Sequence, residues 1–185
     1  MKPNSFKSAL PHIIAVLLFT VISFAYFFPV LEGKKINAHD TKVYEGSSKE
    51  ISDYREKHGG EPLWTNSMFG GMPAYTISMK YPGNLFKHLD NFLKAFKTPV
   101  AALFLSMLGF YIMLLLFGVN PWLAIAGAIA YGFSSYLFVC LSAGHNTKAY
   151  AMAYMAPVIG SVVYSFRRNL LTGASLFALF LSLQI

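Results

Sequence analysis

Cysteine and charged residues are scarce in this sequence, and each scarcity excludes a class of protein. Cys140 is the single cysteine, so neither an internal disulfide nor a cluster of cysteine metal ligands can form. Only 12% of the 185 residues are charged, and soluble domains usually carry about 25%. The composition therefore argues against an ordinary soluble globular protein.

Apolar residues are abundant instead, at 55% of the chain with a mean hydropathy of +0.48. They form long blocks, and about 20 apolar residues in a helix cross the roughly 30 Å hydrocarbon layer. We therefore predict an all-α integral membrane protein, a multi-span helical bundle. The predicted spans are residues 9–31, 99–117, 121–141, 149–166 and 170–185. The fifth run is shorter than a full span, so we expect the chain to be the N-terminal fragment of a longer protein.

The charged residues divide the chain into three parts. All eight acids lie between residues 32 and 98, which we interpret as one large polar loop between the first two spans. The predicted parts are therefore 1–31, with the N-terminal tail and first helix; 32–98, the loop; and 99–185, the later helices. The net charge of +7 does not come from basic runs interleaved with exposed aromatic residues, so we expect no nucleic-acid partner.

Lysine and arginine next to the spans set the expected orientation. Lys2 and Lys7 precede the first span, and an even number of crossings places Arg167 and Arg168 on the same side. By the positive-inside rule this side is the cytoplasm, so the N-terminus is predicted to be cytoplasmic. The loops at 32–98 and 142–148 then face outward.

Three pieces can be distinguished in the large loop. Ser47 and Glu50 form a capping-box pattern, which predicts a helix that ends at residues 59–60. Residues 63–75 are too rich in Gly and Pro for a regular element. Residues 84–97 place apolar and charged side chains on opposite arcs of a helical wheel. This last pattern predicts an amphipathic helix on the bilayer surface, with its apolar side toward the lipid.

A first group of candidate functional residues lies just beyond the first span. Asp40 follows that span by about nine residues, so its carboxylate is expected close to the membrane surface. There it could act as a general base, bind a metal ion or orient an acceptor hydroxyl. His39 could share a metal ion with it. The alternative is that both are solvated loop residues.

A second group, His145, Asn146 and Lys148, lies between the third and fourth spans. A lysine and the free amides at the start of a helix suit a phosphate group. An interfacial loop with a snorkelling lysine explains the same residues without a ligand. Trp64 and Tyr75 could likewise stack on a sugar ring or simply anchor the loop at the interface.

These segments resemble the N-terminal part of the bacterial YfhO-type membrane proteins, which are grouped with the GT-C glycosyltransferases. The most specific strings are WTNSMFGGMPAY at 64–75 and GHNTK at 144–148, together with His39 and Asp40 after the first span. The resemblance covers essentially the whole chain. It implies a GT-C-like fold whose large outward loop carries helices along the bilayer.

The resemblance also implies a function in the bacterial cytoplasmic membrane. GT-C enzymes transfer a sugar from a polyprenyl-phosphate carrier to an acceptor at the outer face. Their first outward loop typically carries an acid that serves the acceptor or a metal, and Asp40 matches it. A divalent metal is compatible with this pattern but is not required. Two other functions stay open: a transporter or flippase for a lipid-linked or anionic solute, and a non-catalytic scaffold. Charges inside the spans, which a transporter is expected to carry, are lacking apart from His12 near one end.

Overall fold

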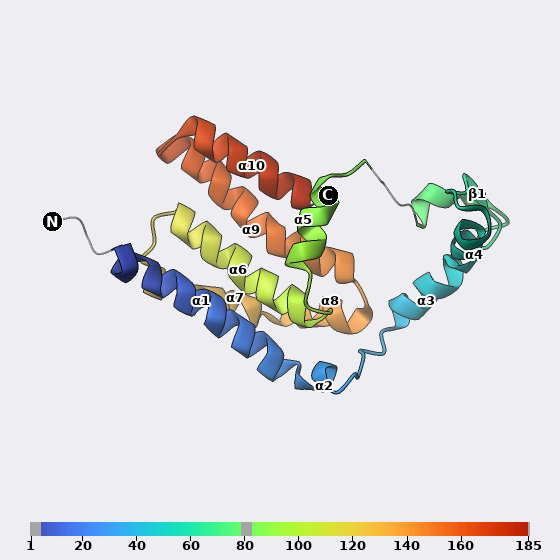
Figure 1. The fold of residues 1–185 in the computed structure, drawn as a ribbon, viewed down its shortest axis with the longest axis horizontal. Coiled ribbons are helices and arrows are strands. Elements are labelled where there is room, and N and C mark those ends of the chain that lie inside the picture. Colours follow the sequence, from blue (N-terminus) through green and yellow to red (C-terminus); the bar gives the residue numbers. More distant parts are fainter. Residues whose placement is uncertain (1–4, 79–82, 185) are drawn as a thin grey trace. The chain divides into compact units, whose positions relative to one another are not determined.

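The computed structural model describes residues 5–78 and 83–184, so that Lys2 lies outside the described residues. Within these ranges the chain is mostly helical, and its two strands are only two residues long (Figure 1). The helices are α1 (Ser5–Tyr26), α2 (Phe28–Leu31), α3 (His39–Ser47), α4 (Lys49–His58), α5 (Phe86–Leu93), α6 (Val100–Leu116), α7 (Pro121–Gly132), α8 (Ser135–Ala143), α9 (Asn146–Arg167) and α10 (Leu170–Gln184).

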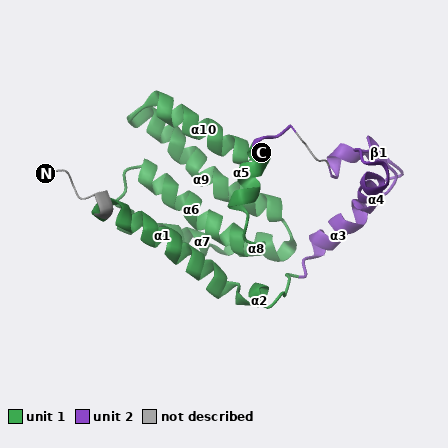
Figure 2. Ribbon diagram, viewed as in Figure 1, with its two compact units in different colours: residues 1–36, 86–185 green, residues 37–85 purple. Residues whose placement is uncertain are grey.

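The chain divides into two compact units (Figure 2). The helical unit comprises residues 1–36 and 86–185, and the loop unit comprises residues 37–85. Residues 86–98, which we expected to be part of the large loop, thus pack with the helical unit.

Two helices are long and apolar enough to cross a membrane, namely Lys7–Tyr26 within α1 and Asn146–Arg167, which is α9. A third crossing is available if α7 and α8 count as one bent span. Helices α6 and α10 have 17 and 15 residues, so they fall short of spanning length. The structure therefore supports a helical protein of membrane character with two or three crossings, fewer than the predicted set.

Two of the predicted spans are interrupted. The first was expected to run to residue 31, but α1 ends at Tyr26 and the short α2 follows, with Pro29 in its first turn. Proline has no amide to continue the hydrogen-bond ladder of α1, which favours a new helix start. The third was expected over 121–141, but α7 and α8 meet at a 43° bend. Ser134 has extended backbone angles there, so it separates the two helices.

The helical unit is built around α6, which packs against α1, α7 and α9, while α10 packs against α9. Glycine permits the close approach of α6 and α9. A Cβ on Gly109 would lie 2.1 Å from the Ala153 carbonyl oxygen, and one on Gly160 would lie 2.9 Å from the Met113 Cα. Such small-residue contacts are typical of helix pairs in membranes, where backbones must approach closely to gain packing energy.

The loop unit holds α3, α4 and a small antiparallel hairpin. Trp64 and Thr65 form β1, which pairs with Met72 and Pro73 in β2. The predicted capping box does not form: Ser47 is the last residue of α3, and its hydroxyl donates to the Tyr44 carbonyl. Because α3 was not expected, the start of the next helix was misplaced. Its end was correct, since Gly59 closes α4 in the left-handed conformation.

Candidate functional site

The start of α9 and the helices beside it form the candidate site in the helical unit. His145 immediately precedes α9, Asn146 is its first residue, and Lys148 lies in its first turn. The His145 amide donates to the Cys140 carbonyl at 2.9 Å, which fixes the turn between α8 and α9. The Lys148 ammonium lies 5.1 Å from the centre of the exposed Tyr136 ring. The sequence-predicted cation therefore lies at the surface of the unit, against an aromatic face.

A small polar pocket of about 110 Å³ opens beside these first turns. Asp90 and Lys94 contribute a carboxylate and an ammonium group from α5 and the residue after it. Thr147 and Tyr150 contribute hydroxyl groups from α9, and Gln184 contributes an amide from the end of α10. A pocket of this size has room for several waters or one phosphate-sized group, since a water occupies about 30 Å³.

Hydrogen bonds join Asp90 to Lys94, just after the end of α5, and to α9. One carboxylate oxygen of Asp90 accepts from the Tyr154 hydroxyl at 3.0 Å, and the other accepts from the Lys94 ammonium at 2.5 Å. The same ammonium lies 4.3 Å from the centre of the Tyr150 ring. The Tyr150 and Thr98 hydroxyls lie 2.6 Å apart. We call these five residues, Asp90, Lys94, Thr98, Tyr150 and Tyr154, the Asp90 network.

The Asp90 network corrects our prediction for residues 84–97. The helix runs only from Phe86 to Leu93. Asp90 and Lys94 contact α9 instead of lying in water, whereas the apolar Phe92 is 75% exposed. The Tyr154 hydroxyl on α9 provides the reason, since it donates to the carboxylate and reduces the cost of moving it from water.

Sequence reasoning missed this network, although two signals were present. Asp90 and Lys94 are four residues apart, the spacing of a helical ion pair. Tyr150 and Tyr154 repeat the same spacing on α9, so that both hydroxyls lie on one face. Either pair alone is common. Local periodicity in the sequence does not show that Asp90 and Tyr154, 64 positions apart, contact each other.

The remaining predicted site residues belong to the loop unit. Asp40 lies in the first turn of α3, where a helix dipole stabilises a carboxylate, and His39 beside it is exposed. Trp64 and Tyr75 are each 57% exposed. The Trp64 indole packs on the backbone of Gly71, where a Cβ would lie 2.7 Å from the indole nitrogen. Asp40 belongs to the loop unit and the cations of α9 belong to the helical unit.

Glu50 holds the loop unit together at one point. Its carboxylate accepts from the Thr65 hydroxyl at 2.5 Å and from the Asn66 amide at 2.8 Å, which ties α4 to the hairpin. These bonds, that of Thr65 first, lower the pKa of Glu50 below its ordinary value. Glu50 therefore does not take part in the capping box that we predicted. It links α4 to the hairpin instead.

Possible metal ligands and similarity to known proteins both bear on the chemistry of the site. Within the described residues, no three His, Cys, Asp or Glu side chains are grouped so that they could hold a metal ion. No family model, no curated protein and no solved structure matches the chain. The YfhO-type resemblance therefore rests on the sequence strings alone.

Proposed function

We propose that the chain is part of an integral membrane glycosyltransferase, which transfers a sugar from a polyprenyl-phosphate carrier to a cell-envelope acceptor. The observation that carries the proposal is the polar pocket beside the first turns of α9. There, charged and hydroxyl groups lie at the end of an apolar helix of spanning length. A lipid-linked sugar presents its phosphate at this depth, with its chain in the hydrocarbon layer.

The charges around the pocket suit a phosphate ligand. Lys94 is held in one position by Asp90 and by the ring of Tyr150. Lys148 is a second cation in the same turn of α9 as Thr147; it does not line the pocket, and its ammonium lies over the Tyr136 ring. The amides that begin α9 also favour an anion, because the first turn of a helix carries a partial positive charge.

The two carboxylates have different roles in this proposal. Both oxygens of Asp90 already accept hydrogen bonds, one of them from Lys94, so Asp90 is a positioning residue for Lys94. Asp40 is the acid that the resemblance assigns to the acceptor. As a general base it would take the proton of the acceptor hydroxyl while the carrier phosphate leaves the sugar. Preorganised cations would stabilise the charge that develops on this phosphate.

The test is sugar transfer by the full-length protein in liposomes that contain a labelled polyprenyl-phosphate sugar. Asp40→Asn keeps the size of the side chain and removes its charge, so we expect a large loss of turnover with little change in carrier binding. Lys148→Ala should instead weaken carrier binding by about 1.5–3 kcal/mol, the usual contribution of a charge-assisted hydrogen bond.

Matched controls distinguish these roles from general charge effects. Asp53→Asn removes an exposed acid of α4, and Lys87→Ala removes an exposed cation of α5. Both variants should behave like the wild type. Wild-type turnover in Asp40→Asn would remove the assigned mechanism, and no transfer from any polyprenyl-phosphate sugar would contradict the proposed reaction.

One observation favours a second function, that of a transporter or flippase. The 43° bend between α7 and α8 interrupts an apolar stretch that would otherwise cross the membrane, and discontinuous helices are typical of transporter binding sites. The same liposomes distinguish the two functions. A flippase moves the intact labelled lipid between leaflets without cleaving the sugar, whereas a transferase cleaves it and needs an acceptor.

A further inference from the structure

Four large apolar side chains of the β1–β2 hairpin and the turn after it are exposed. Leu63 is 79% exposed, Phe69 is 88% exposed, and Trp64 and Tyr75 are each 57% exposed. We call these four residues the hairpin patch. Thr65, next to Trp64, is 1% exposed and donates a hydrogen bond to a side chain of α4. Successive side chains of a strand point to opposite faces, so Trp64 lies on the face of the hairpin that points away from α4.

Phe69 has an unfavourable backbone conformation at the tip of the hairpin. The Gly71 amide donates to the Met68 carbonyl at 2.8 Å and closes a turn. Its two central residues, Phe69 and Gly70, have φ angles of 53° and 74°. Turns with two positive φ angles favour Asn and Gly, and a bulky side chain is strained there. Because the Phe69 side chain is also 88% exposed, packing within the unit does not compensate for this strain. Contact with an apolar body outside the chain would do so.

The polar groups of the hairpin favour a bilayer over a sugar as this apolar body. Residues 62–78 carry no charged side chain, so no ionised group has to leave water when the hairpin meets lipid. The Thr65 hydroxyl donates to Glu50, and the Ser67 hydroxyl donates to the Ser47 carbonyl. These groups are thus engaged within the unit, whereas a small polar ligand needs convergent polar groups beside the aromatic rings.

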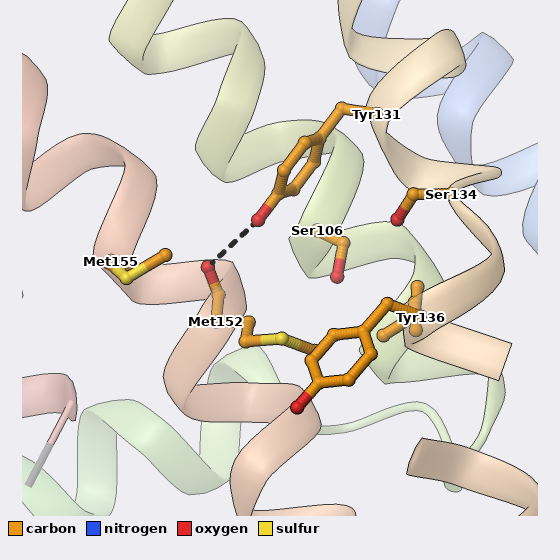
Figure 3. A pocket seen from close by; sticks show the side chains of 7 residues that line it. Ser106, Tyr131, Ser134, Tyr136, Met152 and Met155 are labelled. Carbon is orange, nitrogen blue, oxygen red and sulfur yellow. Dashed lines mark hydrogen bonds between the residues drawn. The ribbon is translucent and has the colours of Figure 1, made fainter. Parts of the chain in front are cut away.

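The shape of the patch leads to the same choice. A small ligand requires a concave site, and the helical unit has one, a pocket of about 330 Å³ whose lining includes Ser106, Tyr131 and Met152 (Figure 3). The hairpin patch projects instead, with its side chains 57% to 88% exposed. A projecting group of Trp, Tyr, Phe and Leu side chains suits the boundary between headgroups and acyl chains.

The chain also keeps the loop unit close to a membrane. Helix α1 contains a helix of spanning length and ends at Tyr26, and the loop unit begins at Asn37. The chain between these two residues extends at most about 40 Å. At its other end, the unit is followed directly by Phe86 of the helical unit. Such tethers raise the effective concentration of the bilayer surface, so a few apolar side chains suffice for contact.

We propose that the hairpin patch inserts into the interface of the lipid bilayer and anchors the loop unit there. The Phe69 ring enters the acyl region from the tip of the hairpin. Trp64 and Tyr75 lie at headgroup level, where their amphipathic rings are favoured. Residues 37–85 carry five Lys or Arg and six Asp or Glu, so the contact is apolar and does not require anionic lipid. The proposal is independent of the glycosyltransferase activity.

Quenching of tryptophan fluorescence by brominated phosphatidylcholine tests the proposal in the full chain. Trp122→Phe leaves Trp64 as the single tryptophan, and bromine on the acyl chains quenches tryptophans that contact lipid. We expect a lower Trp64 emission in brominated than in unbrominated vesicles. The matched position is Val43 on α3, which is 51% exposed in the same unit. A single tryptophan there, from Val43→Trp with Trp64→Phe and Trp122→Phe, should keep its emission. No quenching of Trp64, or equal quenching at both positions, would overturn the proposal.

The variant Phe69→Asn separates lipid contact from folding. Asparagine is favoured at a positive φ, so this variant should unfold at the wild-type temperature or higher. The loss of one large apolar side chain should nevertheless lower the ratio of inserted to free hairpin about tenfold, and Trp64 quenching should fall with it. Val43→Asn removes an exposed apolar side chain outside the patch and should keep wild-type quenching. Wild-type quenching in Phe69→Asn would contradict insertion of the tip.

Lipid charge and an added sugar distinguish the bilayer from other partners. Brominated vesicles that also contain phosphatidylglycerol should quench Trp64 as strongly as brominated phosphatidylcholine alone. Quenching that requires phosphatidylglycerol would assign the contact to lysine residues and contradict an apolar anchor. In unbrominated vesicles, the aqueous quencher acrylamide should have little effect on Trp64. Strong quenching by acrylamide that added maltotriose relieves would indicate a sugar platform and overturn the proposal.

Discussion

At the scale of single residues, Asp90 links elements that lie far apart in the sequence. It pairs with Lys94 four residues later and with Tyr154 on α9. Tyr154 is 5% exposed, so the water that could replace its hydroxyl has little access. A hydrogen bond between a buried hydroxyl and a carboxylate contributes more to stability than one at the surface, because its loss leaves a desolvated charge without a donor.

The first prediction is that Tyr154→Phe destabilises the helical unit by about 1.5–3 kcal/mol, the range for a hydrogen bond to a charged group. Thermal unfolding in detergent, followed by circular dichroism, measures the loss. Tyr131→Phe is the control, because the Tyr131 hydroxyl makes only a long 3.4 Å bond to the Met152 carbonyl. Equal effects of the two variants would contradict a special role for the Asp90 contact.

The second prediction concerns the acid stability of the loop unit. The pKa of Glu50 is lowered in the folded state, mainly by the Thr65 hydroxyl. A carboxyl group whose folded pKa is depressed contributes stability above its unfolded pKa, and this contribution is lost as pH falls through the folded pKa. We therefore expect the loop unit to weaken below the ordinary glutamate pKa of 4.5.

Tryptophan fluorescence measures this transition, because Trp64 adjoins Thr65 and a Trp122→Phe background leaves it as the single tryptophan. Glu50→Gln cannot be ionised, so it should lower the stability at neutral pH and remove the acid transition. Glu45→Gln changes an exposed acid of α3 and should leave the transition in place. A transition that persists in Glu50→Gln would assign it to another group.

At the scale of elements, α5 is amphipathic, and polar contacts with α9 as well as its apolar arc determine its orientation. Its polar residues Asp90 and Lys94 contact α9, and Leu85 and Phe92 are 78% and 75% exposed. Large exposed apolar side chains next to helices of membrane character are suited to lipid contact. The polar contacts therefore stabilise one side of this helix, and the exposed apolar side chains beside it are available for contact with lipid.

The third prediction is that a peptide of residues 84–97 gains helicity on anionic vesicles. It is too short to form a stable helix in water, so burial of its apolar arc must supply the stability. Phe92→Asp should abolish the gain in circular dichroism. Asn91→Asp adds the same charge at an exposed position of the polar arc and should keep most of the gain. No change with vesicles, or equal losses in both variants, would argue against lipid contact.

The elements also show which features the sequence allowed us to predict. Helices α6 and α9 begin and end within a few residues of the expected spans, because apolar blocks bounded by polar residues fix helix ends well. The break before Ser134 was missed, since neither proline nor a charge marks it. Helix α3 was missed because its sequence is polar and has no apolar period.

The candidate site could be predicted only in part, for a related reason. His145 and Lys148 were found because they are adjacent in a short polar loop between apolar blocks. The Asp90 network depends on which faces of distant helices meet, here α5 with α9. Local patterns specify that a helix has a polar face, but tertiary packing decides what that face contacts.

At the scale of the whole molecule, the arrangement of charge gives a testable orientation. Arg167 ends α9 and is exposed, and Lys57 lies on α4 of the loop unit and is also exposed. The proposed topology places the loop unit outside the cell and the end of α9 in the cytoplasm. It requires α9 to cross the membrane, which its length and apolar character permit.

The fourth prediction is that single cysteines at these two positions are labelled from opposite sides. The background is Cys140→Ala, which removes the native cysteine; its side chain is only 2% exposed, and alanine fits the same space. In intact cells, an impermeant maleimide should react with Lys57→Cys and not with Arg167→Cys. After the membrane is permeabilised, both should react, which controls for accessibility because both positions are exposed. Equal labelling of the two positions in intact cells would refute the orientation. It would also place the polar pocket on the wrong side for an outward-facing transferase, because the start of α9 lies at the end of that helix opposite to Arg167.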